Sequence, residues 1–379
     1  MSIVSALSET VLSLSPWLPR TGPVASAQLT PRWLTQQIAA DVPGAEVERI
    51  ERLDGNSGTT DRRRLALHWN ERGKSAGLPA SVFIKSTPLT ASSRLMVAPL
   101  QMAVNEVRFY RTVRQDLADV APLAYATHLG RGARFMLVLE DLSLRGCRPF
   151  SLADEADLDH LRGMMVALGT VHARFWNSPR FSSDLSWLAT ERARPAFSLM
   201  MMVHRRFRKR FLKPETQASD PVRRLARVLI DNEQAVIDQR ERGPLTLAHG
   251  DCHLGNTYRL ADEERSGLLD WQIVHRGAGL RELAYFLGPG APIELRRRHE
   301  KDLLALYLDT LASLGVRDAP KPEQAWDLYR FWMSYAWDAV QMTQMWAGLQ
   351  APANLTASWA RVCAAVEDLD VAGAVKDAI

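Results

Sequence analysis

A polar segment in the second half of the chain carries the residues best suited to chemistry. It reads His249-Gly250-Asp251-Cys252-His253-Leu254-Gly255-Asn256, and Asp270 follows it in the stretch Leu268-Leu269-Asp270-Trp271-Gln272. Phosphoryl transfer needs a carboxylate at the attacking hydroxyl and oxygen ligands for the magnesium that neutralises the phosphates. Asp251 could orient and deprotonate an alcohol, and Asn256 with Asp270 could bind Mg²⁺. Aspartate and asparagine also form ordinary turns, but turns do not require this spacing together with an aspartate at a strand end.

Two residues earlier in the chain could bind nucleotide phosphates. Lys85 ends the apolar stretch Ser81–Lys85, which is predicted as a short buried strand, and Glu106 follows within a predicted helix, Val97–Leu117. Kinases use a strand lysine to pair the α- and β-phosphates and a helix glutamate to hold that lysine. A lone lysine or glutamate is usually a surface residue, but the order of these elements before Asp251 favours the pair. We expect both side chains to border a solvated cleft.

The segment Asp54–Thr60 lies where a loop covering the phosphates would belong. It separates the predicted strands Val47–Leu53 and Arg64–Trp69. Glycines let the backbone approach phosphate closely, and hydroxyl groups add donors. The candidate residues are Gly55, Ser57, Gly58 and Thr59. Because short glycine turns are common and the pattern departs from G-x-G-x-x-G, the atoms that would contact phosphate stay open.

The motifs HGDCHLGN and LLDWQ resemble those of the aminoglycoside phosphotransferase and choline kinase group in the protein-kinase-like superfamily. Their details resemble the ecdysteroid kinase-like branch, where glutamine commonly replaces glycine after the metal-binding aspartate. The resemblance implies that Asp251 is the base, that Asn256 and Asp270 bind Mg²⁺, and that His249 braces the loop. His253 matches a second histidine near the phosphates, where it would either take part in catalysis or pack the loop. ATP and Mg²⁺ are the cofactors implied.

Further positions match the same group less specifically. Glu140-Asp141-Leu142 resembles the connector whose backbone, at Glu140 and Leu142, would hydrogen-bond adenine; a polar strand exit would look the same. Glu282 stands where relatives usually carry aspartate, which leaves its role in bracing the loop open. The motifs span about residues 50 to 290.

The distribution of patterns predicts a strand-rich region followed by a mainly helical one. Besides the elements above, a strand is predicted at Phe135–Leu139, helices at Leu158–Trp176 and Pro221–Gln239, and short strands at Leu245–Ala248, Thr257–Leu260 and Gly267–Leu269. We therefore expect an α+β, two-lobed protein-kinase-like fold with a small antiparallel sheet in the N-lobe and a larger helical C-lobe. The predicted divisions are an extension at 1–40, a nucleotide-binding N-lobe at 41–140 and a catalytic, substrate-binding C-lobe at 141–379.

Composition limits the remaining possibilities. The chain is 46% hydrophobic and 24% charged with a net charge of +4, and no apolar run reaches the length of a membrane span. Three widely spaced cysteines indicate neither a disulfide framework nor a zinc site, which favours a reducing, cytoplasmic location. The basic stretch His204–Arg210 is interpreted as a solvated helix face, because no nucleic-acid-binding motif accompanies it. We expect no nucleic-acid partner, and the oligomeric state stays open.

The acceptor is less well defined than the reaction. The helix predicted at Trp326–Trp346 is apolar nearly all round, so it either packs in the core or borders a pocket for an apolar or aromatic alcohol. The stretch His204–Arg210 would instead favour an anionic substrate. A small-molecule kinase is the first hypothesis, and a catalytically inactive nucleotide-binding regulatory module is the alternative. A protein kinase is disfavoured, because no A-P-E element follows Asp270.

Overall fold

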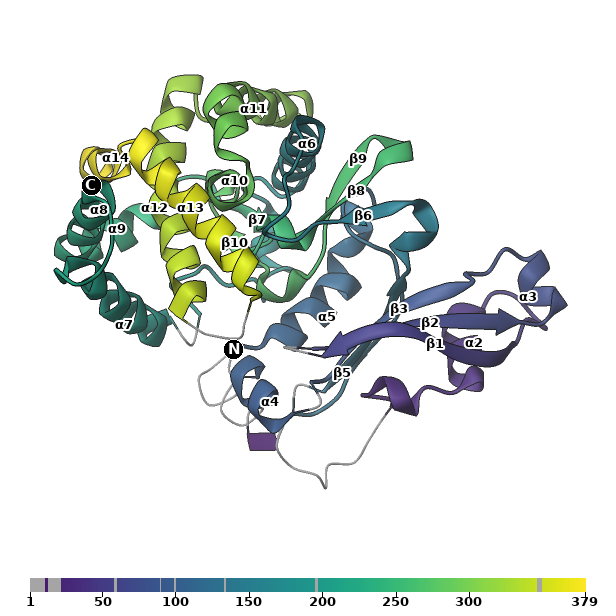
Figure 1. Cartoon of the computed structure of the whole chain (residues 1–379). Coiled ribbons are helices and arrows are strands. Elements are labelled where there is room, and N and C mark those ends of the chain that lie inside the picture. Colours follow the sequence, from purple (N-terminus) through teal and green to yellow (C-terminus); the bar gives the residue numbers. More distant parts are fainter. Residues whose placement is uncertain are drawn as a thin grey trace. The chain divides into compact units, whose positions relative to one another are not determined.

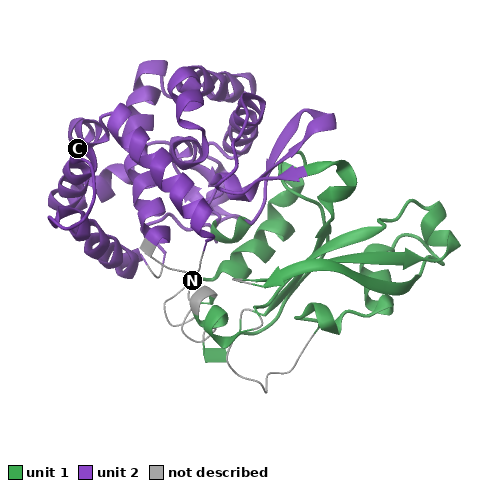
Figure 2. Cartoon of the chain, in the orientation of Figure 1, with its two compact units in different colours: residues 1–147, 271–273 green, residues 148–270, 274–379 purple. Residues whose placement is uncertain are grey.

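The computed structural model describes residues 11–12, 22–57, 60–88, 90–98, 100–132, 134–194, 197–345 and 350–379. The chain forms two compact units, which Figure 2 distinguishes by colour. Unit 1 comprises Met1–Cys147 and Trp271–Ile273, and unit 2 comprises Arg148–Asp270 and Val274–Ile379. The architecture is α+β, with an antiparallel sheet in the smaller unit and mainly helices in the larger one, as predicted.

Unit 1 is built on one five-stranded antiparallel sheet with the strand order β1-β2-β3-β5-β4. The strands are β1 (Val47–Ser57), β2 (Asp61–Trp69), β3 (Ser81–Ser86), β4 (Ala124–Leu129) and β5 (Phe135–Glu140). In β2 the side chains of Leu65, Leu67 and Trp69 are buried while their neighbours are less so, the alternation expected of a strand with one face on a core. Helix α2 (Pro31–Ile38) packs on this sheet, and Thr30 caps its first turn.

The helix predicted at Val97–Leu117 is divided in the structure. Helix α4 spans Ala91–Val97, α5 spans Met102–Thr112, and a 3₁₀ turn, η2, covers Arg114–Leu117. Gln101 has a left-handed backbone with φ of 56°, which no α-helix tolerates in its interior. The sequence also places a proline at position 99, and proline cannot donate to the helical hydrogen-bond ladder. The prediction was therefore wrong about the start of the helix that carries Glu106, and β4 was not predicted at all.

The larger unit is a group of helices around a buried one, α10 (Gly279–Gly290), as Figure 1 shows. The others are α6 (Leu158–Arg174), α7 (Phe197–Arg208), α8 (Asp220–Asp231), α9 (Glu233–Arg240), α11 (Ile293–Ser313), α12 (Pro322–Met345), α13 (Pro352–Asp368) and α14 (Val371–Ala378). Every residue of α10 is buried, and its main neighbour is α12. A Cβ at Gly288 would collide with Met333 of α12, so glycine permits this close helix contact.

Short strands in unit 2 carry the loops that matter for function. Strand β7 (Thr246–Ala248) pairs with β10 (His275–Gly277). Strands β8 (Thr257–Leu260) and β9 (Arg265–Leu268) form an antiparallel hairpin, with β6 (Cys147–Pro149) beside β8. No helix in the described ranges is long and apolar enough to cross a membrane.

Two sequence-based predictions about helices in this unit, one for α12 and one for α7, can be compared with the burial of their side chains. Tyr329, Met333 and Asp338 of α12 are completely buried, which agrees with core packing; Trp346 lies outside the described residues. The basic stretch His204–Arg210 covers the last turn of α7 and the start of the 3₁₀ turn after it, and the prediction of a solvated face is wrong for Arg208. That side chain is only 2% exposed, because it forms an ion pair with buried Asp338.

Candidate active site

The loop that carries Asp251 begins after β7 with His249, and its second residue is a glycine in a conformation that favours glycine. Gly250 has φ of 89°, a backbone conformation that side-chain-bearing residues rarely adopt. The chain then continues through His253 into a 3₁₀ turn, η6 (Leu254–Asn256), and from there into β8. The local sequence therefore forms a short loop between β7 and β8, and Asp251 lies within this loop.

The Asp251 carboxylate is held by three side chains and stays accessible to solvent. Its Oδ1 accepts a hydrogen bond from the Tyr285 hydroxyl at 3.0 Å, and its Oδ2 accepts one from Asn256 Nδ2 at 3.2 Å. His253 Nε2 lies 3.6 Å from the same Oδ2. The Asp251 side chain is 30% exposed, so an added hydroxyl group can reach an oriented carboxylate.

His249 connects this loop to the strand end that precedes Asp270. Its Nε2 donates to the carbonyl of Leu269 at 2.9 Å, and its Nδ1 accepts from the backbone N–H of Asp251 at 3.2 Å. These two bonds require the neutral ring with its proton on Nε2. Burial lowers the pKa of His249 against the opposing effects of Glu282 and Asp251, which agrees with a neutral ring.

Asn256 and Asp270 lie at the same end of the β8–β9 hairpin. Thr257 pairs with Leu268, and the Asn256 carbonyl accepts a hydrogen bond from the Leu269 N–H at 2.8 Å. Asp270 follows at once with a left-handed backbone, φ 65°, at the start of the 3₁₀ turn η8 (Trp271–Ile273).

These two side chains fit Mg²⁺ by the chemistry of their donors. Asn256 Nδ2 donates to the Asp251 carbonyl at 2.8 Å, which leaves Oδ1, an oxygen that accepts no hydrogen bond from any described residue. Mg²⁺ prefers such oxygen ligands and usually takes one or two carboxylates with phosphates and water, rather than a cage of protein ligands. The described residues contain no group of three or more His, Cys, Asp or Glu side chains placed to hold a metal.

Glu282 of α10 braces the loop, although relatives usually carry aspartate at this position. Its Oε2 accepts from the His249 N–H at 2.7 Å, and its Oε1 accepts from the Gly250 N–H at 2.8 Å. His172 Nε2 lies 3.3 Å from Oε2 and is itself held by the Tyr307 hydroxyl at 2.9 Å. Burial would raise the pKa of Glu282, but His172, His249 and a buried arginine of α10 lower it to about 2.

Three further positioning residues were missed by the sequence reasoning: Tyr285, His172 and His160. His160 of α6 bridges the β8–β9 hairpin, with Nε2 2.9 Å from Thr257 Oγ1 and Nδ1 3.0 Å from Ser266 Oγ. Burial lowers its pKa to about 3, so the ring is neutral at ordinary pH. A polar residue inside the apolar pattern of α6 was the available signal for both histidines, whereas nothing local marked Tyr285.

In unit 1 the structure brings Lys85 and Glu106 together. Lys85 Nζ lies 2.7 Å from Glu106 Oε1, joining β3 to α5. The expectation that both border a solvated cleft is wrong for this structure, since their side chains are 5% and 1% exposed. Helix α5 also holds the turn that follows Asp270, because Phe109 stacks on Trp271 with ring centroids 4.0 Å apart.

The predicted phosphate loop is mostly the end of a strand. Strand β1 continues through Ser57, and Gly55 has no room for a Cβ beside the Arg62 carbonyl. The Ser57 hydroxyl donates to buried Asp61 at 2.6 Å. Gly58 and Thr59 lie outside the described residues.

The predicted connector begins with Glu140, the last residue of β5. The Glu140 carboxylate accepts from the Leu123 N–H at 2.7 Å and lies 3.2 Å from Arg145 Nη1, so its side chain already has partners. Leu142 begins a 3₁₀ turn, η3 (Leu142–Arg145), which the Asp141 side chain caps. Any contact with adenine would thus fall to the backbone of this segment.

Comparison with known proteins adds a family and a fold. A model of the ecdysteroid kinase-like family matches residues 59–316. One similar solved structure is a protein from Ralstonia eutropha described provisionally as an aminoglycoside phosphotransferase. It is 14% identical to this chain with a TM-score of 0.51, and the match covers 90% of this chain and 97% of that one. A choline kinase from Streptococcus pneumoniae is 11% identical with a TM-score of 0.49, covering 89% and 98%. Curated protein sequences give no significant match. The first of these structures establishes a shared fold.

Proposed function

Since this chain belongs to the ecdysteroid kinase-like family, we propose that it is a small-molecule kinase that transfers the γ-phosphoryl group of ATP to a hydroxyl group. The observation that carries the proposal is the arrangement around Asp251. A partly exposed carboxylate is held by Tyr285 and Asn256. Asn256 and Asp270, whose side-chain oxygens suit Mg²⁺, lie at one end of the β8–β9 hairpin. Phosphoryl transfer depends mainly on positioning and on charge neutralisation, and these are the features that the loop offers.

Asp251 acts as the general base in this proposal. Each of its oxygens accepts one hydrogen bond from a neighbouring side chain, which fixes the carboxylate plane. A carboxylate has about four lone-pair sites, so it can still accept the proton of an acceptor hydroxyl. Orienting that hydroxyl and removing its proton is worth about 10²–10⁴-fold in rate. His253 Nε2 lies 3.6 Å from Oδ2 and adds a further contact to the carboxylate.

Asn256 and Asp270 would hold Mg²⁺, which when bound neutralises charge on the phosphates. The residues around them keep the two ligands in register. His249 Nε2 donates a hydrogen bond to the carbonyl of Leu269, the residue before Asp270, and the Leu269 N–H donates one to the Asn256 carbonyl. Because of these bonds, a shift of one of the two ligands would strain the backbone at the other.

Lys85 and Glu106 would serve the nucleotide. Lys85 would pair the α- and β-phosphates, and Glu106, at 2.7 Å, would position its ammonium group. The buried ion pair holds the lysine side chain in one geometry, because an unpaired buried charge is costly. The backbone at Glu140 and Leu142 would bind adenine, and Gly55 and Ser57 would lie near the phosphates.

The experiment that tests the proposal is a screen of hydroxyl-bearing metabolites for ATP-dependent phosphorylation, with ADP release and product mass as readouts. Wild-type protein should consume ATP only with an acceptor and Mg²⁺, whereas Asp251→Asn should bind Mg²⁺–ATP and turn over the acceptor about 10²–10⁴-fold more slowly. Tight Mg²⁺–ATP binding without phosphorylation of any alcohol would instead support an inactive nucleotide-binding module. Equal turnover by both proteins would remove Asp251 from the mechanism.

A further inference from the structure

Helix α7 and the 3₁₀ turn that continues it, η5 (Lys209–Leu212), present a stripe of apolar and basic side chains to solvent. Leu199 and Met202 are 57% and 62% exposed. Arg206 and Lys209 are exposed as well. Because these four positions are three or four residues apart, they lie on one face of the helix and its continuation. The outer face of α7 therefore carries two apolar side chains followed by two basic ones.

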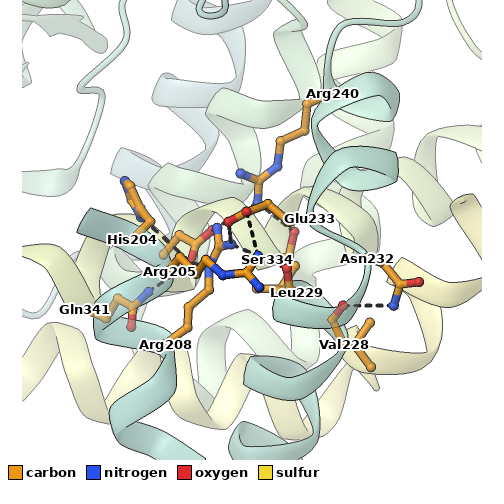
Figure 3. A network of polar contacts seen from close by, with 11 residues as sticks. His204, Arg205, Arg208, Val228, Leu229, Asn232, Glu233, Arg240, Ser334 and Gln341 are labelled. Carbon is orange, nitrogen blue, oxygen red and sulfur yellow. Dashed lines mark hydrogen bonds and ion pairs between the residues drawn. The ribbon is translucent and has the colours of Figure 1, made fainter. Parts of the chain in front are cut away.

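The opposite face of α7 is held by a buried ion pair. Arg208, 2% exposed, donates to both oxygens of the Asp338 carboxylate of α12, at 2.8 and 2.6 Å. Gln341 donates to the same carboxylate at 2.9 Å, and His204, one turn before Arg208, lies 3.9 Å from it. Figure 3 shows His204 and Arg208 within this polar network. The usual burial pattern is thus inverted in α7, with an arginine inside and a leucine and a methionine outside.

The ion pair fixes the rotation of α7 about its own axis. An arginine that donates twice to one carboxylate is held in a single geometry, and a buried charge that loses its partner is strongly destabilising. Turning the helix to bury Leu199 and Met202 would carry Arg208 away from Asp338. A single exposed leucine is ordinary, but two apolar side chains in line with cations, held outward by the core, mark an interaction surface.

The charges of this segment have one sign. Residues 192–214 contain eight lysines and arginines and no aspartate or glutamate. Three of the arginines pair with carboxylates of α9 and α12. Arg206 and Lys209 form no ion pair with any residue that the structure describes. Lys213, 61% exposed, reaches Glu215 only at 3.9 Å, where solvent screens the pair. The outer side of the segment therefore keeps a positive charge.

The combination of features fits the surface of an anionic phospholipid bilayer. A nucleic acid would bind the cations through its phosphates but leave Leu199 and Met202 in water. An apolar groove of a protein would cover those two side chains but not the charges in line with them. A bilayer accepts both, because apolar side chains enter the boundary between headgroups and acyl chains while cations meet the lipid phosphates. At 12 residues, α7 is too short to cross a bilayer and would lie in the plane of its surface.

From this arrangement we infer that the stripe of Leu199, Met202, Arg206 and Lys209 binds the surface of anionic membranes. Such binding requires neither ATP nor an acceptor alcohol, so it stands apart from the proposed function. Each basic side chain near an anionic surface strengthens binding about fivefold, and added salt weakens this attraction. The two apolar side chains contribute a part of the affinity that does not depend on charge. Lys213, which follows the stripe, adds to the electrostatic part.

Vesicle binding by the full-length protein is the first test. The protein is mixed with vesicles of phosphatidylcholine alone or with about 30% phosphatidylserine, at about 0.15 M salt, and the bound fraction is measured by flotation. We expect the anionic vesicles to bind at least about tenfold more tightly than the neutral ones, and less tightly as salt is added. Equal binding to both, or no binding to anionic vesicles at millimolar lipid, would overturn the inference.

Two combined variants locate the binding surface on α7 and η5. The change Arg206→Gln with Lys209→Gln and Lys213→Gln should weaken binding to anionic vesicles about 10²-fold. The change Leu199→Ser with Met202→Ser should weaken it at least about tenfold. Matched controls remove the same numbers of exposed basic and apolar side chains elsewhere in unit 2, and should bind within about threefold of wild type because salt screens distant charges. They are Arg298→Gln with Arg317→Gln and Lys321→Gln, and Val166→Ser with Leu314→Ser.

The outcomes distinguish the bilayer from other partners. Binding that survives the apolar change but not the basic one would show adsorption by charge alone and refute the inference. Equal losses in the matched controls would refute the placement on α7. Binding of single-stranded RNA but not of vesicles, lost with the three basic residues, would assign the stripe to nucleic acid instead.

Hydrogen exchange of the wild type gives a test that needs no variant. Anionic vesicles should slow exchange of the amides in Phe197–Leu212 and leave those of α11 unchanged, because only the bound helix is shielded and stabilised. Unchanged exchange in α7 with vesicles bound would refute the inference, even if a variant failed to fold.

Discussion

Replacing Glu282 with glutamine should loosen the loop that carries His249 and Asp251, by an amount that depends on pH. The carboxylate accepts backbone N–H bonds from His249 and Gly250, one on each oxygen. Glutamine is almost the same size but has one acceptor and one NH₂ group. Whichever way the amide lies, its NH₂ faces a buried backbone N–H, so one donor of the loop loses its partner.

The magnitude follows from the pKa of Glu282, which is about 2 in the folded chain against an ordinary 4.5. That difference corresponds to about 3 kcal/mol, and two hydrogen bonds to a charged acceptor give a similar total. Glu282 is only 1% exposed, so screening by solvent removes little of this. Because the folded pKa is the lower one, the stabilisation is fully present above about pH 4.5 and is lost as the pH falls towards 2.

The assay is urea unfolding of wild-type protein and Glu282→Gln, followed by tryptophan fluorescence and by hydrogen exchange of the Gly250 amide. The free energy of unfolding should differ by about 3 kcal/mol at neutral pH and by about 2 kcal/mol at pH 3.5. Glu294→Gln is the control, because Glu294 is 78% exposed and its pair with Arg297 should matter by under about 1 kcal/mol. A difference below about 1 kcal/mol, or one independent of pH, would refute the reasoning.

The remaining predictions concern turnover. Asp251→Asn should lower kcat about 10²–10⁴-fold with ATP affinity unchanged, and near-normal kcat would contradict its role as base. Asp270→Asn should raise the Mg²⁺ concentration needed for activity, and an unchanged Mg²⁺ titration would reject it as a ligand. Lys85→Met and Glu106→Gln should each depress kcat/KM for ATP, and the double variant should be far less impaired than the product of the two losses; losses that multiply would show independent action. Tyr285→Phe should lower kcat up to about tenfold without changing the KM for ATP, because Asp251 loses one hydrogen bond; a kcat equal to wild type would show that Tyr285 does not position the base.

The sequence alone was sufficient where function depends on residues close together in the chain. Asp251 and Asn256 are joined by a short loop, and Asp270 follows one hairpin later, so spacing and strand pattern already imply that they share one end of a sheet. Strands β2 and β5, which pair with the strand that carries Lys85, were also predictable, because alternation and apolar runs are local signals. The division into a strand-rich part and a helical part followed from the order of those signals.

Tertiary structure decided what spacing cannot express. Glu282 and Tyr285 reach the loop from a buried helix about thirty residues away, and His172 reaches Glu282 from another. Only a packed core sets which face of α10 meets β7, and composition alone cannot predict that register. The ion pair between Arg208 and buried Asp338 is the clearest case. In sequence a basic stretch suggests a solvated surface, but burial removes the solvent that would neutralise each charge, so partners must be counted in three dimensions.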